Sequence, residues 1–321
     1  MGWEEAAGQA AERSPSYPMP PIANAIVREI RPHQWSKNAL VLVPIMLAPG
    51  IPKWPVIGLG FLAAIAFNLC ASAGYVLNDL LDIEADRAHP TKKNRPFASG
   101  ALPVTMGPIL CIGLVSGAVA LSLAFLPLKF LIMLGIYFAG TVLYSAVLKR
   151  TLMVDVLVLA GLYSHRVLAG GVATGIPVSS WLMGFSIFVF TSLAFAKRYV
   201  ELRDLTGDGA VRNRGYIRQD LPMVGAMGSA SGFLSALVFV LYVESAAISA
   251  GYKEPGLLWL ALPVLLYWLG RIWLLAGRGQ MHEDPVRFAL KDRVSLLCGA
   301  VIAGLVALAR FPPPFLLHFF H

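Results

Sequence analysis

The feature that most constrains the fold is a series of long apolar blocks that recurs along the whole chain. Most blocks run for about 18–25 residues, the length that an α-helix needs to cross the hydrocarbon core of a bilayer. Only a helix or a closed barrel satisfies its own backbone hydrogen bonds in lipid, and the blocks lack the alternating polarity of barrel strands. Charged residues, Pro and Gly delimit nine candidate spans, at 38–50, 56–78, 103–126, 129–148, 153–174, 180–197, 221–249, 256–276 and 292–311.

The composition supports a membrane protein and excludes several other classes. Hydrophobic residues make up 57% of the 321 residues and charged residues only 14%, whereas about a quarter of the residues in soluble domains are charged. A soluble enzyme, a secreted disulfide scaffold and a disordered chain are therefore excluded. We expect an all-α polytopic membrane protein of about nine transmembrane helices. Residues 1–25 are predicted to form a flexible cytoplasmic segment without a signal peptide, and residues 26–321 a single transmembrane catalytic domain.

The positive charge of the chain indicates its orientation. The formal net charge is +8, and with a cytoplasmic N-terminus 21 of the 26 Lys and Arg residues fall on the cytoplasmic side. By the positive-inside rule, this asymmetry predicts an N-in, C-out topology, in a bacterial inner membrane and with a site that opens to the cytoplasm. Because orientation accounts for the charge, we expect no nucleic-acid partner.

An acidic cluster follows the second span, in a predicted loop over 78–102. Asp79, Asp82 and Asp86 are spaced three and four residues apart, so they lie on one face of a continuing helix. Like charges on one face repel each other, and a divalent cation would neutralise them. Mg²⁺ prefers such oxygen ligands, often together with substrate phosphates. We therefore predict that Asp79, Asp82 and Asp86 are metal ligands and catalytic residues.

A second acidic cluster, Glu201, Asp204 and Asp208, follows the sixth span with the same spacing, in a predicted loop over 197–220. Acidic residues also flank membrane helices without any further function. Two clusters in register at one membrane face favour the functional interpretation. The sequence leaves open whether the second cluster binds another metal or orients substrate and basic residues, and we rank orientation first.

Basic residues surround both clusters. Lys and Arg at such a mouth match the ligands of a Mg²⁺-bridged diphosphate, although Lys92 and Arg218 are more typical of anchors to lipid headgroups. Arg166 lies inside the fifth span, where a charge usually faces a partner or a wet cavity, so we predict that it binds an anion. The predicted substrate-binding residues are Lys37, Asn78, Arg87, Lys93, Arg95, Tyr144, Arg150, Arg166, Lys197, Arg198, Glu201, Asp204 and Asp208, with Lys149 as a further catalytic residue.

Several motifs resemble the UbiA superfamily of intramembrane prenyltransferases. The first acidic cluster reads Asn78-Asp79-x-x-Asp82-x-x-x-Asp86 and is followed by Asn94-Arg95-Pro96 and Ala98-Ser99-Gly100. The number of spans and the second acidic cluster are similar too. The resemblance implies a UbiA-like helical bundle, in which a polyprenyl diphosphate binds through Mg²⁺ and the prenyl group passes to an acceptor.

A narrower set of motifs is similar to one branch, the decaprenyl-phosphate phosphoribosyltransferase family. This set comprises 31–38, 86–96, Tyr144-Ser145 with Lys149, Asp155-Val156 with 166–171, and 196–202. The resemblance implies Mg²⁺-dependent transfer of a 5-phosphoribosyl group from phosphoribosyl diphosphate to decaprenyl phosphate, for the arabinan precursors of a cell wall. Glu201 departs from the Asp that begins the second cluster in general prenyltransferases, but it fits this branch.

Two rival interpretations stay open. An aromatic prenyltransferase of the UbiA type would use a polyprenyl diphosphate as its donor. A transporter would show repeated, broken helices near the middle of the membrane, whereas acidic clusters at one face suit a one-sided enzyme. The Gly- and Ala-rich eighth and ninth spans are compatible with packing inside one chain or in a homo-oligomer.

The metal assignment predicts that Asp79→Ala and Asp82→Ala each abolish transfer, because the diphosphate would lose its bridged cation. The measurement is transfer activity at saturating Mg²⁺ in purified variants whose insertion and monodispersity match the wild type. Near-normal activity in either variant would contradict the assignment.

Overall fold

The computed structural model describes residues 22–48, 50–88, 91–205, 214–246, 248, 251–281 and 284–314. Within these ranges the regular elements are α-helices and short 3-10 helices. The expected all-α fold class is therefore confirmed for the described part of the chain.

Eight helices of the described residues are long and apolar enough to cross a membrane. They confirm the polytopic architecture and correspond to the expected spans from 56–78 onward. The helices are α4 (Trp54–Leu81), α6 (Met106–Phe125), α7 (Leu128–Ala146), α8 (Val154–Thr174), α9 (Ser180–Arg203), α10 (Leu221–Val243), α11 (Ala261–Gly277) and α13 (Arg293–Arg310), and the 3-10 helices η4 (Arg218–Asp220) and η5 (Pro255–Leu260) precede α10 and α11.

The first expected span, 38–50, differs from the others because the chain there forms short pieces. Arg31 adopts a left-handed backbone conformation with φ 53°, which breaks the helix before it. Pro44 cannot donate a backbone hydrogen bond, so the helical segment around it stays short. The count of nine crossing helices therefore stays a prediction. The pieces are α2 (Ile22–Ile30), η1 (Pro32–Leu42) and α3 (Val43–Met46).

Local chemistry explains several helix ends. The side chain of Ser179 caps α9 by accepting a hydrogen bond of 3.1 Å from the backbone of Leu182, as N-cap residues do. Asp292 caps α13 in the same way. Gly175 ends α8 in the left-handed region, with φ 71°, where glycine has no Cβ to clash. By contrast, α9 continues past residue 197 to Arg203, which places the start of the second acidic motif on a helix.

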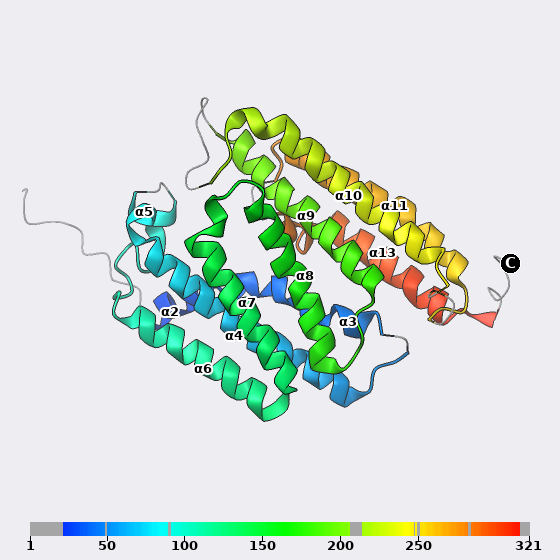
Figure 1. Cartoon of the computed structure of the whole chain (residues 1–321), viewed down its shortest axis with the longest axis horizontal. Helices are drawn as coiled ribbons and strands as arrows, with labels where there is room; N and C mark the ends of the chain where they lie inside the picture. The colour runs from blue at the N-terminus through cyan, green and yellow to red at the C-terminus, as the bar shows by residue number, and fades with distance from the viewer. Residues whose placement is uncertain are drawn as a thin grey trace, which may run out of the picture.

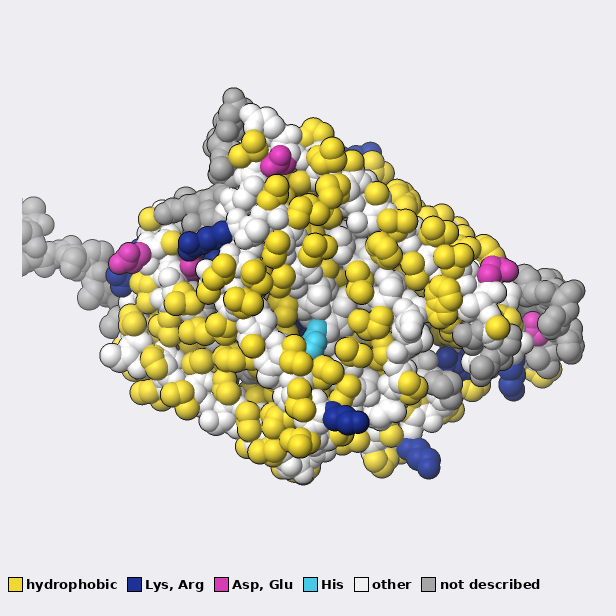
Figure 2. Space-filling model, viewed as in Figure 1, with side chains coloured by type: hydrophobic (Ala, Val, Ile, Leu, Met, Phe, Trp, Pro, Cys, Tyr) yellow, Lys and Arg dark blue, Asp and Glu magenta, His cyan; other side chains and the backbone are white. Residues whose placement is uncertain are grey.

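Helices α8 and α9 lie at the centre of the bundle (Figure 1). In their most apolar stretches 56% and 50% of the residues are buried, against 11% in α6. Hydrophobic side chains cover most of the outer face in Figure 2, and charged side chains lie toward its edges. Phe61, Ile109 and Leu123 are among the exposed apolar residues. Such a surface fits helices that face lipid.

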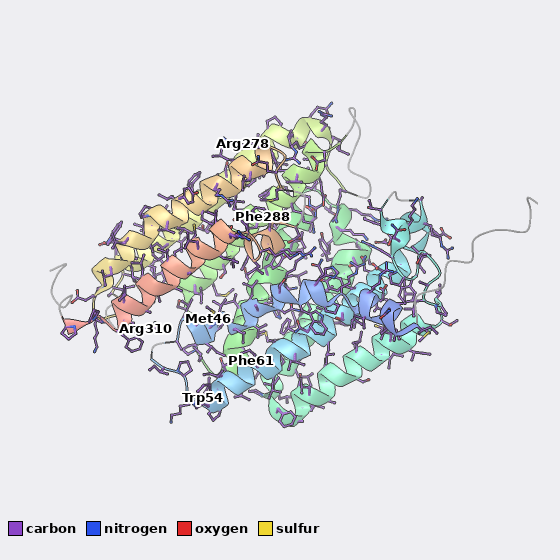
Figure 3. The ribbon with its side chains drawn as sticks, turned by 180° about the vertical axis from the view of Figure 1, so that it is seen from behind. Met46, Trp54, Phe61, Arg278, Phe288 and Arg310 are labelled. Carbon is purple, nitrogen blue, oxygen red and sulfur yellow. The ribbon has the colours of Figure 1, made fainter. Side chains whose placement is uncertain are left out.

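One end of the bundle gathers the predicted motifs. We call the end that carries Asp79, Lys149 and Lys197 the motif end. Four short helical segments lie in the connections there, namely α5 (Ile83–Arg87), η2 (Lys92–Asn94), η3 (Leu148–Arg150) and α12 (Pro285–Ala289). At the opposite end, Arg310 of α13 donates to the backbone carbonyl oxygens of Leu47, at 3.2 Å, and Ala48. Seen from behind, α13 runs from the region of Phe288 to that end (Figure 3).

The close approach of η1 to α8 yields a stability prediction. A Cβ added at Gly170 would lie 2.0 Å from the carbonyl oxygen of Val41, so Gly170→Ala must displace backbone atoms. We expect the free energy of unfolding to fall by about 1–3 kcal/mol, measured by thermal unfolding in detergent.

Gly161 on the same helix provides the control. A Cβ there meets no atom within 4 Å, so Gly161→Ala should leave stability unchanged or raise it by about 0.5–1 kcal/mol. Equal effects of the two substitutions would show that the packing of η1 on α8 is not the constraint.

Candidate active site

Asp79 is the best-buried carboxylate of the first acidic motif. It lies in the last turn of α4, and its side chain is 1% exposed. Its carboxylate forms ion pairs with the guanidinium groups of Arg31 and Arg95. One nitrogen of Arg95 lies 3.0 Å from Asp79 and 2.6 Å from Asp86. A single cationic nitrogen therefore joins two carboxylates of the motif.

The helix that carries this motif is interrupted at Asp82. α4 ends at Leu81 and α5 begins at Ile83, but the i to i+4 hydrogen bonds continue from Asp82 to Asn78 and from Asp86 to Asp82, at 3.0 and 2.8 Å. The interruption separates the three carboxylates. Asp79 and Asp86 share Arg95, while Asp82 pairs with Lys149 of η3 at 3.0 Å. Lys149 itself is buried.

These contacts decide how a metal ion fits the first motif. No three metal-ligating side chains among the described residues are grouped closely enough to hold an ion. Asp79 and Asp86 nevertheless converge on one cationic nitrogen, and Mg²⁺ commonly uses one or two carboxylates together with substrate phosphates. Asp79 and Asp86 therefore fit a two-carboxylate site, with Asp82 turned toward Lys149.

Glu29 of α2 is a neighbour of Asp79 that the sequence analysis missed. Its side chain is fully buried. Burial and the charge of Asp79 raise the pKa of Glu29 to about 8, so it is mostly protonated at neutral pH. Glu29 is a single acidic residue in an amphipathic segment before the first motif. No sequence pattern marks it as a neighbour of the site.

A second cluster joins Lys37 and Lys197 through Asp284, which was also not predicted from the sequence. The ammonium groups of Lys37 and Lys197 lie 3.1 and 3.2 Å from the same carboxylate oxygen. Burial raises the pKa of Asp284, but the two lysines outweigh burial and hold this pKa below its ordinary value. Asp284 is the N-cap of the short helix α12, which lies between α11 and α13. Its ion pairs with Lys37 and Lys197 fix this connection against η1 and α9.

Arg166 lies buried beside this cluster. Its guanidinium group donates to Asn38 at 2.8 Å, to the carbonyl oxygen of Leu162 at 2.6 Å and to the hydroxyl group of Tyr137 at 2.8 Å. The rings of Tyr137 and Tyr163 lie 4.7 and 5.1 Å from its carbon Cζ. These partners are neutral, so the positive charge of Arg166 adds to that of Lys37 and Lys197.

Arg198, which the sequence predicts to bind substrate, is engaged by carboxylates of the protein itself. Its side chain is fully buried and pairs with Asp155 at 3.1 Å and with Glu201. Asp155 also accepts a 2.8 Å hydrogen bond from the hydroxyl group of Tyr216. Arg198 thus ties α8 to α9 and orients Glu201, whose side chain is one third exposed.

The remaining predicted residues lie around these clusters. Asp204 pairs with Arg203 at the surface, and Tyr144 accepts a 2.8 Å hydrogen bond from Arg214. Asn78 lies next to Asp79, at 3.5 Å between their polar atoms. Asp208 lies outside the described residues. The structure leaves three further predicted cations exposed at the motif end: Arg87, Lys93 and Arg150.

The opposite end of the bundle contains an apolar pocket of about 480 Å³. It lies between α3, α9, α10 and α13, and its lining includes Leu47, Phe185 and Val306. Its volume falls in the range of about 300–1,000 Å³ found for ligand sites. The protein therefore has charged clusters at one end and an apolar pocket at the other.

A comparison with protein families decides the membership of this chain. Residues 39–297 match the UbiA prenyltransferase family. The chain belongs to this family. The match includes both acidic motifs and all the spans from α4 to α11, so the family resemblance of the motifs is confirmed, and a multi-pass membrane protein is expected from both family and hydropathy.

Three relatives show how the chain is placed within the family. The uncharacterized protein y4nM of Sinorhizobium fredii is 37% identical over 88% of this chain, which spans 55% of that protein's length. The nodulation protein NoeC of Azorhizobium caulinodans is 34% identical, over 87% of this chain and 91% of that protein. The decaprenyl-phosphate phosphoribosyltransferase of Mycobacterium tuberculosis is 32% identical, over 90% of this chain and 96% of that protein.

A solved structure shares the fold. The UbiA homolog from Archaeoglobus fulgidus bound to DMAPP and Mg²⁺ superposes with a TM-score of 0.66, over 90% of this chain and 99% of that one. Its sequence is 15% identical, so the likeness concerns the fold alone.

The Asp284 cluster yields a prediction about stability. Asp284→Asn leaves the buried ammonium group of Lys37 and the partly exposed one of Lys197 without their carboxylate. We expect the free energy of unfolding to fall by about 3 kcal/mol, the lower end for buried pairs, because Lys197 is one third exposed. Cations lower the pKa of Asp284, so this stabilisation is present above about pH 4, the ordinary value, and is lost as the pH falls through the folded-state pKa. Thermal unfolding should therefore separate variant and wild type at pH 7 and less so below pH 4.

Asp204→Asn is the matched control. Asp204 also pairs with a cation, but its side chain is 53% exposed, so its loss should cost at most about 1 kcal/mol. A deficit of the Asp284 variant no larger than that of this control would contradict the role of Asp284.

Proposed function

We propose that the protein transfers a 5-phosphoribosyl group from phosphoribosyl diphosphate to a polyprenyl phosphate such as decaprenyl phosphate, with Mg²⁺ as cofactor. The observation that carries the proposal is the presence of two separate cationic clusters at the motif end. The reaction needs them because the donor carries a diphosphate and a 5-phosphate, and the lipid acceptor carries a further phosphate. The relative from Mycobacterium tuberculosis bears the name of this activity. The two clusters are Arg31, Arg95 and Lys149 around the acidic motif, and Lys37, Lys197 and Arg166 around Asp284.

The first cluster suits the diphosphate of the donor. Asp79 and Asp86 are the carboxylates that would hold Mg²⁺, which when bound neutralises charge on the diphosphate leaving group. Arg95 and Lys149, which pair with the acidic motif, can then bind phosphate oxygens directly. Arg offers a planar fork for this purpose and Lys a compact point charge.

The second cluster suits the phosphate of the lipid acceptor. Lys37, Lys197 and Arg166 carry three positive charges against the single carboxylate of Asp284. An oxygen of the lipid phosphate forms the new bond to ribose C1, while the bond from C1 to the diphosphate breaks and its electron pair leaves with the diphosphate. C1 develops oxocarbenium character, as in other glycosyl transfers, and attack from the opposite face inverts its configuration.

The chain needs no general base for this reaction, because a phosphate monoester is already ionised near pH 7. Its residues act by positioning the two substrates and by stabilising charge. The apolar pocket at the opposite end has a lining suited to part of a long prenyl chain. We further propose that the motif end faces the cytoplasm of a bacterial cell, where a water-soluble donor is available, and that the product serves arabinan and cell-wall synthesis.

A UbiA-type aromatic prenyltransferase is the second candidate, favoured by the match of residues 39–297 to the UbiA prenyltransferase family. The test is to incubate the purified protein with ribose-labelled phosphoribosyl diphosphate and decaprenyl phosphate. We expect a labelled lipid that forms only with Mg²⁺ and is absent with Asp79→Ala. Prenyl transfer from a polyprenyl diphosphate to hydroxybenzoate, without any labelled lipid, would replace our proposal with this candidate.

A further inference from the structure

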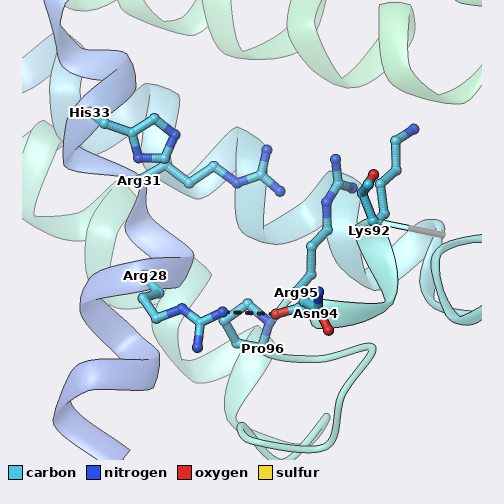
Figure 4. A pocket seen from close by; sticks show the side chains of 8 residues that line it. Arg28, Arg31, His33, Lys92, Asn94, Arg95 and Pro96 are labelled. Carbon is cyan, nitrogen blue, oxygen red and sulfur yellow. Dashed lines mark hydrogen bonds between the residues drawn. The ribbon is translucent and has the colours of Figure 1, made fainter. Parts of the chain in front are cut away.

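A pocket at the motif end adjoins the first cationic cluster and shares Arg31 and Arg95 with it. It is an open pocket of about 370 Å³ between α2, the start of η1 and residues 91–96. The side chains in Figure 4 show the guanidinium groups of Arg31 and Arg95 extending toward each other across it. The other basic residues that line it are Arg28, His33 and Lys92.

The pocket carries an excess of positive charge. The described residues that line it include three arginines and one lysine, and no carboxylate. Arg31 and Arg95 reach Asp79, and Arg95 reaches Asp86, so two carboxylates offset only part of this charge. A predominantly basic lining of this kind suits an anion such as a phosphate monoester.

A hydrogen bond joins the two walls of the pocket. Arg28 donates a 2.8 Å hydrogen bond to the backbone carbonyl oxygen of Asn94, which fixes α2 to the segment that carries Lys92 and Arg95. A guanidinium group has five N–H donors, and the bonds of Arg28 to Asn94 and of Arg31 to Asp79 each involve one nitrogen. Further donors of both residues are therefore available to a ligand.

The pocket is continuous with the first cluster, because Arg31 and Arg95 line the pocket and also bind Asp79. A ligand with a diphosphate at one end and a phosphate monoester at the other can occupy both places. Arg28, His33 and Lys92 are exposed, which suits a water-soluble ligand, whereas the apolar pocket lies at the opposite end. The sequence alone had favoured Lys92 as a membrane anchor.

We propose that this pocket binds the phosphate monoester of the soluble donor, which is the 5-phosphate if the proposed function holds. The pocket then selects a phosphorylated sugar donor over a prenyl diphosphate, which carries no second phosphate group. The acceptor's lipid phosphate shares the same chemistry, so the test must separate the two sources.

The test measures binding without turnover. Isothermal titration calorimetry of the purified protein in detergent, without Mg²⁺, uses ribose 5-phosphate in one arm and dimethylallyl phosphate in the other. We expect Lys92→Ala and Arg28→Ala each to weaken the binding of ribose 5-phosphate about tenfold or more, as for hydrogen bonds to charged groups. Arg28→Lys, which keeps the charge, should recover part of the loss.

Arg278→Ala is the matched control, because Arg278 is an exposed cation at the end of α11 and does not line the pocket (Figure 3). The affinity of the Arg278→Ala variant for ribose 5-phosphate should equal that of the wild type. Absence of ribose 5-phosphate binding to the wild type, wild-type affinity in both alanine variants, or a loss confined to dimethylallyl phosphate would each overturn the proposal.

Failure of the pocket and failure of the reaction give different results. A wild type that forms no labelled lipid but binds ribose 5-phosphate through Lys92 supports the pocket and rejects the reaction. If the wild type forms labelled lipid and Lys92→Ala has an unchanged KM for the donor, the proposal for the pocket is wrong. The proposed reaction is then still supported.

Discussion

The pairing of buried charges at the motif end is the constraint on which the rest of the structure depends. A buried carboxylate without a partner costs several kcal/mol, and Asp79 is almost completely buried. Its partners Arg31 and Arg95 come from segments before and after α4, so satisfying Asp79 also fixes α2 and residues 91–96 on that helix. Asp155 and Arg198 do the same for α8 and α9. The charges that suit polyanionic substrates therefore also hold the connections in place.

Hydropathy predicts the fold well because the length of a span is a local property. It is least decisive at 38–50, where the apolar block is short and Pro44 interrupts it. The acidic motif is equally local, since the spacing of Asp79, Asp82 and Asp86 is visible in the sequence. Its geometry is not, because the interruption at Asp82 turns that side chain to Lys149 while its neighbours share Arg95.

Some features of the site depend on contacts between residues that are distant in sequence, and local patterns do not show these contacts. Asp284 stands in a connection without a periodic pattern, and only the docking of α12 brings it to Lys37 and Lys197. Arg198 carries the same charge as its neighbour Lys197, so composition cannot show that one is fully buried and the other partly exposed. Which face of a helix points inward is hard to read in a bundle whose outer surface is also apolar. For the same reason, the fold shared with a 15% identical homolog cannot specify the substrates.

The excess of cations at the motif end has a kinetic consequence. Positive potential around a mouth accelerates the arrival of polyanions, an effect that weakens with ionic strength. The same potential opposes their departure. In the proposed reaction each turnover expels a diphosphate from between Arg31, Arg95 and Lys149, whose carboxylate partners Asp79 and Asp82 already lie beside them. These carboxylates can pair with the cations again as the diphosphate leaves. The acidic motif therefore acts as an internal counterion that weakens the binding of the product.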